Sequence, residues 1–406
     1  MNRTESKSEI DTKKIVIFGA GKIGRSFIGQ LFGCGGYKVV YVDIDPVVVN
    51  LLNEKGCYRI VIKGDKENEL IVPNVQAISA LEPDKVAEAV STAGILAVSV
   101  GKNALAKIAP IIAKGLMTRY SNDPELPLDI ILAENMRSAG DYMKGLLEKL
   151  LPPDYPVEKL VGLVETSIGK MVPILTIADL EKDPLLVFAE PYNTLIVDGK
   201  GFKSQIPQIQ GISAKNNIKA WVDRKAFIHN LGHATAAYFG NHLHPQAVYL
   251  YEVLDDQTVF DFTREVMLQS AETLQAAYPD DFTLPDLIAH IDDLLHRFRN
   301  RALKDTVFRV GQDLQRKLGA DDRFMGAVHL AIQHGKLYGK ILEAMSFGFF
   351  FDAKDELGLN PVEDLSFRES LHSNFENTLV QKCDFDVKKD VNLIDELKNH
   401  YSHYQL

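Results

Sequence analysis

The fold is decided by one stretch near the N-terminus, Ile15-Val16-Ile17-Phe18-Gly19-Ala20-Gly21-Lys22-Ile23-Gly24. It begins with four apolar residues, which favour a buried strand, and then changes to glycines in the spacing GxGxxG. Residues 22–32 continue in a helical pattern. A strand, a glycine turn and a helix in this order predict the start of a βαβ unit whose turn can hold a phosphate group.

The residues after this turn indicate what it would bind. A second β-rich run, 37–42, ends on Asp43, nineteen residues after Gly24. An acid at this point accepts hydrogen bonds from an adenosine ribose and repels a 2′-phosphate, so Asp43 favours NAD over NADP. The alternative is a glycine turn that only connects two elements, and the context disfavours it. The predicted cofactor-binding residues are Phe18, Gly19, Ala20, Gly21, Lys22, Ile23, Gly24, Arg25 and Asp43.

Strand-like and helical runs alternate through the first half of the chain. One helical pattern opens at Pro46 and another covers 104–114. Further β-rich runs cover 58–62, 95–100, 130–133, 160–166 and 185–197. This alternation predicts an α/β domain with a Rossmann-type, doubly wound parallel sheet, which we expect to be the NAD-binding domain and to span 14–200.

The second half of the chain has a different pattern. The segment 199–213 is rich in Gly, Lys, Gln and Pro and marks the expected domain boundary. Beyond it, long amphipathic patterns dominate, over 218–239, 245–277, 286–298 and 324–345. We therefore expect a mainly α-helical catalytic domain over 201–406.

Composition narrows the class of partner. The 406 residues include 45 Lys plus Arg and 55 Asp plus Glu, a net charge of −10, and 46% are hydrophobic. An acidic chain with real cores argues against nucleic acid or a membrane surface as the partner and favours a small molecule. Three scattered cysteines, no apolar leader and no membrane-spanning run predict a reducing, cytoplasmic location.

One helical pattern concentrates groups that can do chemistry. With Lys225 set at 0° and about 100° per residue, His229 lies at roughly 40°, His233 at roughly 80° and Asn230 at roughly 140°. Apolar residues, among them Phe227 and Leu231, occupy the opposite side. The helix would therefore offer a Lys, an Asn and a His to one cleft.

These residue types suit the oxidation of an alcohol. Lys225 could take the hydroxyl proton if its pKa fell from about 10.4 to roughly 7–8, while Asn230 and His233 would donate to the oxygen that becomes a carbonyl. One alternative is a solvated helix face with no catalytic role. Another is a zinc site built on His229 and His233, but HNLGH lacks the acid of HExxH and no Cys cluster completes it. We expect no metal.

Four segments carry a resemblance to a known family. They are IVIFGAGKIGRSFIG, ENMRSAG, RKAFIHNLGHATAAYFG and RKLGADDR. Together they resemble the polyol-specific long-chain dehydrogenases, and within them the members that act on mannitol 1-phosphate. The match covers nearly the whole chain. The resemblance implies a metal-independent enzyme that interconverts D-mannitol 1-phosphate and D-fructose 6-phosphate with NAD.

The resemblance also implies roles for single residues. Lys225 would be the general acid/base, and Asn230 and His233 would hold the reacting oxygen. Asn135 of ENMR matches a residue beside the substrate in relatives. Substrate-binding residues implied in this way, or expected as cations near the substrate, are Asn135, Arg137, Arg309 and Lys317.

One departure leaves the substrate open. Family members carry Val-Asp-Arg-Ile-x-Pro where this chain has Ile168-Gly169-Lys170-Met171-Val172-Pro173, so a carboxylate is missing. The alternatives are a dehydrogenase of an unphosphorylated hexitol or hexuronate, and a non-catalytic protein that senses NAD. A phosphate anchor would separate these readings, and its candidates are Arg137, Lys170, Arg309, Arg316, Lys317 and Arg323.

Overall fold

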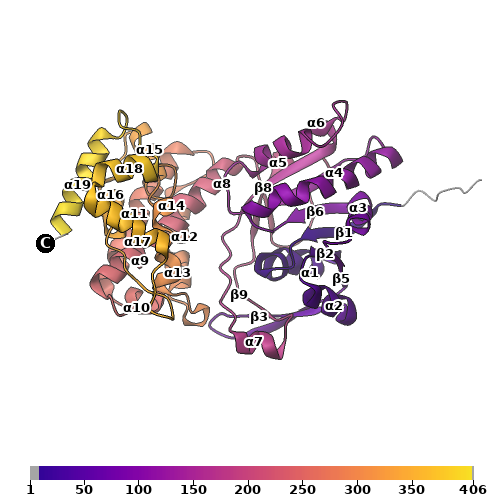
Figure 1. Ribbon diagram of the computed structural model, residues 1–406, viewed down its shortest axis with the longest axis horizontal. Coiled ribbons are helices and arrows are strands. Elements are labelled where there is room, and N and C mark those ends of the chain that lie inside the picture. The colour runs from indigo at the N-terminus through magenta and orange to yellow at the C-terminus, as the bar shows by residue number, and fades with distance from the viewer. Residues whose placement is uncertain (1–8, 405–406) are drawn as a thin grey trace, which may run out of the picture. The chain divides into compact units, whose positions relative to one another are not determined.

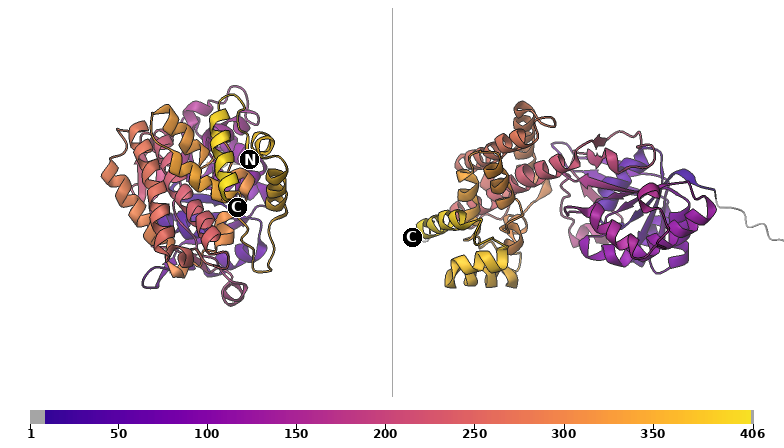
Figure 2. Two further views of the ribbon diagram at one scale, coloured as in Figure 1. Left: turned by 90° about the vertical axis from the view of Figure 1, so that its left-hand side faces the viewer. Right: turned by 90° about the horizontal axis from the view of Figure 1, so that it is seen from above.

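The computed structural model describes residues 9–404, which form two compact units divided between Ile218 and Lys219 (Figure 1). Within these residues, every strand lies in the first unit, and the second unit is helical (Figure 2). The expected class, a Rossmann-type α/β domain followed by a helical domain, is confirmed. The expected boundary after residue 200 falls inside the first unit, and as the border between domains it stays a prediction.

The main sheet of the first unit has eight strands in the order β11-β10-β8-β7-β6-β1-β2-β5. All neighbouring strands are parallel except β8 and β10, which are antiparallel. Their bounds are β1 Asp11–Phe18, β2 Lys38–Asp43, β5 Val75–Ser79, β6 Ala93–Val98, β7 Leu128–Leu132, β8 Val161–Ser167, β10 Leu195–Asp198 and β11 Ile212–Lys215.

Strand β1 lies inside this sheet, between β6 and β2, and its residues 15–18 are buried on both faces. Ile15 and Ile17 belong to one hydrophobic cluster, and Val16 and Phe18 belong to another. Burial on both faces explains why the strand is a continuous apolar run. One cluster includes residues of α1 (Gln30–Cys34), the π-helical turn before it (Gly24–Gly29) and α2 (Pro46–Lys55), and the other includes α3 (Pro83–Ser91), α4 (Leu105–Asn122) and α5 (Ala139–Glu148).

Two of the predicted β-rich runs do not belong to the main sheet as expected. The run 58–62 is β3 (Tyr58–Ile62) of a separate three-stranded sheet in the order β4-β3-β9. The run 185–197 is two strands, β9 (Val187–Ala189) in the small sheet and β10 in the large one. Pro191 lies between them and cannot donate a ladder hydrogen bond. The remaining elements of this unit are β4 (Asn68–Val72), α6 (Val157–Leu160) and α7 (Ile177–Lys182).

The second unit is built around one long helical segment. It starts as α8 (Ile218–Arg224), continues through a π-helical turn (Lys225–Asn230) and ends as α9 (Leu231–Leu243). Helix α9 packs against α10 (Leu250–Leu254), α11 (Gln257–Ala277), α13 (Val307–Gly311) and α16 (Gly339–Gly348). The other helices are α12 (Leu284–Phe298), α14 (Leu314–Lys317), α15 (Met325–Gln333), α17 (Val362–Ser373), α18 (Phe375–Cys383) and α19 (Val391–Tyr404).

Close approach to α9 depends on small residues. A Cβ at Gly232 would lie 2.4 Å from the sulfur of Met267 in α11, and one at Gly240 would lie 2.6 Å from Val253 in α10. The segment 231–238 is almost entirely buried, with Tyr238 fully enclosed. Helix α9 is therefore the core element of this unit, and the residues at its start are held in fixed positions.

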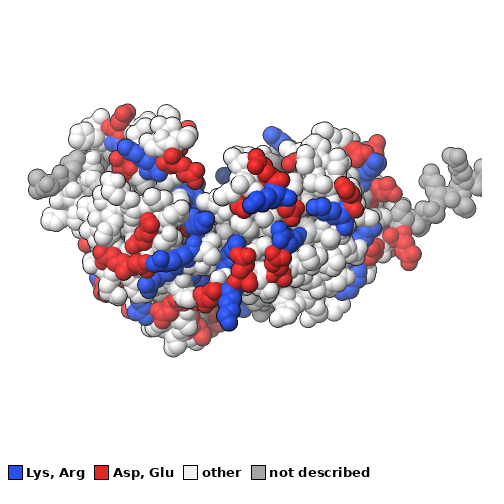
Figure 3. Space-filling model, turned by 90° about the horizontal axis from the view of Figure 1, so that it is seen from below, with Lys and Arg blue, Asp and Glu red and all other residues white. Residues whose placement is uncertain are grey.

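Acidic and basic side chains are mixed on one face of the protein. The face drawn in Figure 3 carries Lys and Arg interspersed with Asp and Glu, with no extended field of one sign. Among residues 9–404, no helix is both long and apolar enough to cross a membrane.

Alanine at two glycines of the first turn should affect stability to different extents. A Cβ at Gly24 would lie 2.0 Å from the carbonyl oxygen of Gly19, whereas a Cβ at Gly21 meets nothing within 4 Å. Gly24→Ala should therefore lower the free energy of unfolding by about 1–3 kcal/mol, and Gly21→Ala should change it by less than about 1 kcal/mol. Chemical denaturation measures both. Equal stability of the two variants would contradict this account of the turn.

Candidate active site

The glycine turn is held in shape by contacts from two neighbouring strands. Gly19 has φ +94°, and a Cβ there would lie 2.5 Å from the carbonyl oxygen of Ser99, which follows β6. The backbone N–H of Ala20 donates to Oδ2 of Asp43 at 2.6 Å. The turn therefore requires glycine at position 19 and depends on Asp43 for its shape.

The helix after the turn begins in π form, which leaves carbonyl groups in need of outside partners. Two buried tyrosines supply them. The Tyr41 hydroxyl donates to the Gly24 carbonyl at 3.2 Å, and the Tyr58 hydroxyl donates to the Arg25 carbonyl at 2.7 Å. The two hydroxyl oxygens lie 2.9 Å apart. A Cβ at Gly29 would lie 1.7 Å from the Tyr41 oxygen, so glycine there admits the tyrosines.

These residues fit a dinucleotide. Gly21 and Lys22 are exposed at the start of the helix, where backbone N–H groups favour a phosphate. Nothing occupies the space that a Cβ of Gly21 would fill, so a pyrophosphate can approach the backbone there. Asp43 uses one oxygen for Ala20 and the other for the N–H of Asp45 at 3.0 Å. A carboxylate accepts about four hydrogen bonds, so it can still accept from a ribose.

Arg25, one of the predicted cofactor-binding residues, lies inside the protein. Its Nε donates to the Ala20 carbonyl and its Nη1 donates to the Leu185 carbonyl, each at 2.6 Å. The side chain is 7% exposed, and burial lowers its pKa. Arg25 therefore ties the turn to the segment before β9. Phe18 is also buried, and Ile23 is half-buried beside the turn.

The ENMR segment follows β7, at the carboxyl end of the parallel sheet. Oε1 of Glu134 accepts from the N–H groups of Val100 and Gly101, at 2.8 and 3.0 Å. Burial raises the pKa of Glu134. Asn135 and Arg137 are both exposed. Ligands of such sheets bind at the carboxyl ends of the strands, so Asn135 and Arg137 stand where a substrate can meet them.

Lys170, in the segment that departs from the family pattern, serves an internal contact. Its ammonium group donates to Oε1 of Gln30 at 2.8 Å and to Oδ1 of Asn193 at 2.7 Å. It also lies 5.0 Å from the centre of the Phe27 ring, and the residue is 6% exposed. Lys170 therefore joins the segment 168–173 to the first helix, and as a buried, fully bonded cation it is a poor anchor for a phosphate.

The predicted catalytic residues lie on the π-helical turn and the start of α9. A π turn closes hydrogen bonds to the fifth residue, so each residue advances by less than the roughly 100° of an α-helix. The predicted position of Asn230, roughly 140° from Lys225, is therefore wrong. The wider turn brings Asn230 closer to the direction of Lys225, and it brings His233 closer as well. Lys225 and Asn230 are half-buried, and His233 is largely so.

Burial and cations set the charge of Lys225. Burial, together with the guanidinium groups of Arg323 and Arg316, lowers the pKa of Lys225 to about 8, against the opposing effect of Asp322. Arg323 is held in place by Asp322, whose Oδ1 lies 2.8 Å from its Nε, and its Nη1 donates to the Asn230 carbonyl at 3.2 Å. The residue thus reaches the neutral form near physiological pH, as a general base requires.

His233 lies between an aromatic ring and an acid. Its ring stacks on Phe298 at 4.6 Å between centroids and 17° between planes. Its Nε2 lies 3.2 Å from Oδ2 of Asp305, within ion-pair distance, although the contact is bent from the ideal hydrogen-bond direction. Burial lowers the pKa of His233. His229 packs against the same Phe298 ring at 5.5 Å, is buried and faces the interior.

The other cations around this helix are paired or buried. Arg309 forms an ion pair with Asp305, and Arg316 contacts Asp313 at 2.5 Å. Lys317 is 6% exposed and donates to the Val310 carbonyl at 2.6 Å. Burial and the neighbouring arginines lower its pKa to about 7. Of the predicted substrate contacts in this unit, Lys317 thus lies inside it, whereas Arg309 remains 43% exposed.

Several residues of the site were missed from the sequence. Asp305 and Phe298 contact the predicted residues from other elements, and no motif marks them. Asp322 lies within the quoted segment RKLGADDR but was given no role. Glu134 was quoted within ENMR but given no role. Its place directly after a buried strand was a usable signal, because acids at that edge of a parallel sheet face ligands.

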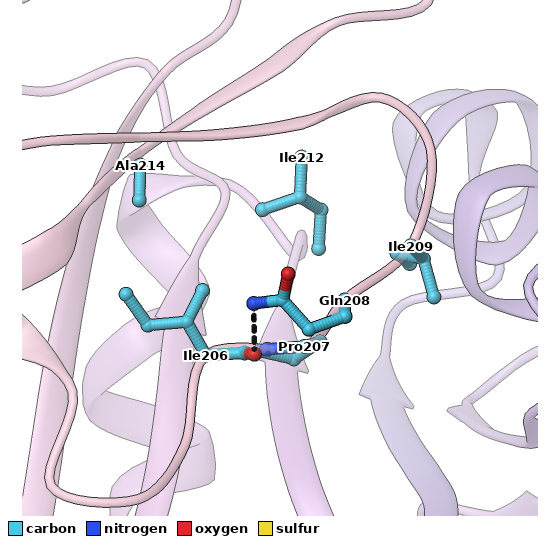
Figure 4. Close-up of a pocket in the computed structure, with 6 residues that line it drawn as sticks. All are labelled: Ile206, Pro207, Gln208, Ile209, Ile212 and Ala214. Atoms are coloured by element: carbon cyan, nitrogen blue, oxygen red, sulfur yellow. Dashed lines mark hydrogen bonds between the residues drawn. The ribbon is translucent and has the colours of Figure 1, made fainter.

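The first unit also has a hollow of about 410 Å³ (Figure 4). Its lining residues carry no ionisable side chain, and Gln208 is turned onto the Ile206 carbonyl at 3.0 Å. They are Ile206, Pro207, Gln208, Ile209, Ile212 and Ala214. Within the described residues, no group of three or more His, Cys, Asp or Glu side chains is placed to hold a metal ion, so the His229 and His233 pair is not part of one.

Known proteins share both units. Residues 13–211 match the mannitol dehydrogenase Rossmann domain, and residues 217–404 match the mannitol dehydrogenase C-terminal domain. The chain is 32% identical over 396 residues to a mannitol-1-phosphate 5-dehydrogenase of Geobacillus stearothermophilus, covering 96% of this chain and 99% of that protein.

Two solved structures share the fold at 14% identity. A D-sorbitol dehydrogenase in substrate-free form has a TM-score of 0.79 over 97% of this chain and 93% of its own. Mannitol 2-dehydrogenase of Pseudomonas fluorescens, in a ternary complex with NAD and D-mannitol, has a TM-score of 0.72 over 99% and 93%. With both domain models matched, the chain belongs to the mannitol dehydrogenase family.

Proposed function

We propose that this chain is an NAD-dependent, metal-independent dehydrogenase that interconverts D-mannitol 1-phosphate and D-fructose 6-phosphate. The observation that carries the proposal is Lys225, whose pKa falls to about 8 on a helix that also presents Asn230 and His233. A merely solvated lysine would not be buried beside two arginines. The relative of Geobacillus stearothermophilus, a mannitol-1-phosphate 5-dehydrogenase, supports the phosphorylated substrate.

The residues of the chain divide the work of the reaction. Lys225 takes the proton of the reacting hydroxyl in oxidation and returns it in reduction. The amide of Asn230 donates to the same oxygen as it gains carbonyl character. NAD, bound at the glycine turn with its ribose on Asp43, would accept the hydride. Burial of Phe298 and His229 around the helix excludes water from one side.

The phosphate is the feature that separates this substrate from a free hexitol. Arg316 and Arg323 are paired with aspartates, and Lys170 is bonded internally. Arg137, exposed after β7, is a member of the cation set that can meet a phosphate. Arg309 and Arg316 are paired with Asp305 and Asp313, but 43% and 50% of their side chains are exposed. The free cysteines Cys34, Cys57 and Cys383 support the proposed cytoplasmic location.

A substrate panel tests the proposal. Reduction of NAD should be fastest with mannitol 1-phosphate, and slower by at least about 10-fold in kcat/KM with mannitol or sorbitol 6-phosphate. Prior chelation of divalent metals should leave the rate unchanged. A preference for free mannitol would support the unphosphorylated alternative, absence of turnover with NADH still bound would support a sensing protein, and loss of activity that zinc restores would overturn the lysine mechanism.

Lys225 should give the reaction its pH dependence. Oxidation needs the neutral amine, so its rate should rise with pH through about 8, and reduction should fall over the same range. Lys225→Ala should lower the chemical rate by roughly 10²–10⁴-fold and remove this limb, with NADH binding nearly unchanged. Because Lys317 also titrates in this range, at about 7, Lys317→Met is the control, and it should keep the limb. Near wild-type turnover and pH profile in Lys225→Ala would refute the mechanism.

Asp43 should set the preference for NAD, and the structure dictates the variant. Because Oδ2 accepts from Ala20, Asp43→Asn keeps an acceptor for the turn and removes the charge, which Asp43→Ala does not. Asp43→Asn should reduce the ratio of kcat/KM with NAD to kcat/KM with NADP by about 10-fold or more. Gly21→Ala, which folds normally, should weaken NADH binding because its methyl occupies the phosphate approach. A wild type that uses both cofactors equally would contradict the role of Asp43.

A further inference from the structure

Asp305 is held in place by contacts other than the one with His233. It precedes α13, and the N–H of Leu250 donates to its backbone carbonyl at 2.8 Å. The next residue, Thr306, forms a β-bridge with Tyr249, and its hydroxyl accepts from the N–H of Arg309 at the start of α13. The side chain is 7% exposed. The carboxylate is therefore held rigidly at a buried position.

Each oxygen of this carboxylate has its own partner. Oδ1 accepts from Nε of Arg309 at 2.5 Å and from its Nη2, and Oδ2 lies 3.2 Å from Nε2 of His233. Burial alone would raise the pKa of Asp305, but His233 and Arg309 hold it at about 2. Asp305 is thus ionised at neutral pH and can only accept hydrogen bonds.

An ionised carboxylate decides which nitrogen of His233 carries the proton. An unprotonated Nε2 would direct its lone pair at the Asp305 carboxylate, which is unfavourable, so the proton lies on Nε2. Burial disfavours the doubly protonated ring, and Arg309 and Lys317 also oppose it, against the pull of Asp305. In the neutral ring, Nδ1 then has a lone pair and no proton. The Phe298 stack holds the ring in this orientation.

We propose that Asp305 is a positioning residue that makes His233 an acceptor at Nδ1, so that His233 receives a hydrogen bond from a substrate hydroxyl and does not donate to the carbonyl oxygen. Nε2 is buried 3.2 Å from Oδ2 of Asp305, so Nδ1 is the nitrogen that we assign to a ligand. This assigns His233 a different role from the donor expected from the sequence. The donor to the reacting oxygen is then Asn230.

We assign to His233 the substrate hydroxyl on the carbon beside the reacting carbon. Resting on the proposed function, the reacting hydroxyl has one hydrogen, and Lys225 takes it. An acceptor at His233 therefore needs a second hydroxyl, which a polyol supplies on the neighbouring carbon and a simple secondary alcohol does not. His233, positioned by Asp305, would thus favour a substrate that has this neighbouring hydroxyl over one that lacks it.

Nitrogen NMR of the full chain tests the tautomer without any substrate. With ¹⁵N-labelled histidine and His233→Gln to assign the signal, the wild type should show a protonated Nε2 and an unprotonated Nδ1 at neutral pH. In Asp305→Asn the preference for the tautomer with the proton on Nε2 should be lost, because an amide can donate as well as accept. The control is Asp255→Asn. This variant removes a different carboxylate, which pairs with Arg299 and Arg301, and it should leave the His233 signal unchanged.

Kinetics test the substrate class. A hexitol phosphate that lacks the hydroxyl beside the reacting carbon should have kcat/KM lower by at least about 10-fold in the wild type, and Asp305→Asn should narrow this gap. A proton on Nδ1 in the wild type, or an equal loss on both substrates in Asp305→Asn, would overturn the proposal. The wild-type spectrum decides the tautomer even if Asp305→Asn fails to fold. If no polyol phosphate is turned over, the proposed function fails while the tautomer is still measured.

Discussion

The burial of Lys225 is the constraint on which the second unit depends. An ammonium group loses hydration when it is buried, and here two arginines nearby add repulsion, so its neutral form is favoured. Such an arrangement would be costly unless the arginines were themselves neutralised. Asp322 and Asp313 do this, with contacts of 2.8 Å to Arg323 and 2.5 Å to Arg316. The aspartates therefore hold the two arginines in place beside a lysine that can release its proton.

In each unit, one carboxylate both holds neighbouring residues in place and takes part in the proposed site. Asp43 holds the glycine turn through the Ala20 N–H and remains able to accept from a ribose. Asp305 is locked by Arg309 and in turn controls the ring of His233. From the sequence, Asp43 is assigned to a ligand and Asp305 is overlooked. Both acids also fix the groups that surround the ligand. Removing either one changes geometry as well as charge, which is why amide replacements are more informative than alanine.

Much of this could be predicted from sequence because local patterns carry it. The GxGxxG turn, Asp43 and the alternation of runs predicted the α/β class, and one helical stretch predicted that Lys225, Asn230 and His233 share a face. The small sheet was missed because the runs 58–62 and 185–197 look like any other buried strands, and pairing depends on tertiary contacts. Asp305 and Phe298 reach His233 from elements distant in sequence, where spacing carries no signal.

The two π-helical turns show why helix geometry from spacing alone misplaced Asn230. A π turn adds a residue to the helix, and buried carbonyls near it need donors from elsewhere, since an unpaired buried carbonyl is unfavourable. In the first unit Tyr41 and Tyr58 donate to Gly24 and Arg25, and in the second Arg323 donates to Asn230. Each donor comes from a different element. The distortion that brings the reactive groups together is therefore specified by residues outside the helix, and the helix sequence by itself cannot reveal it.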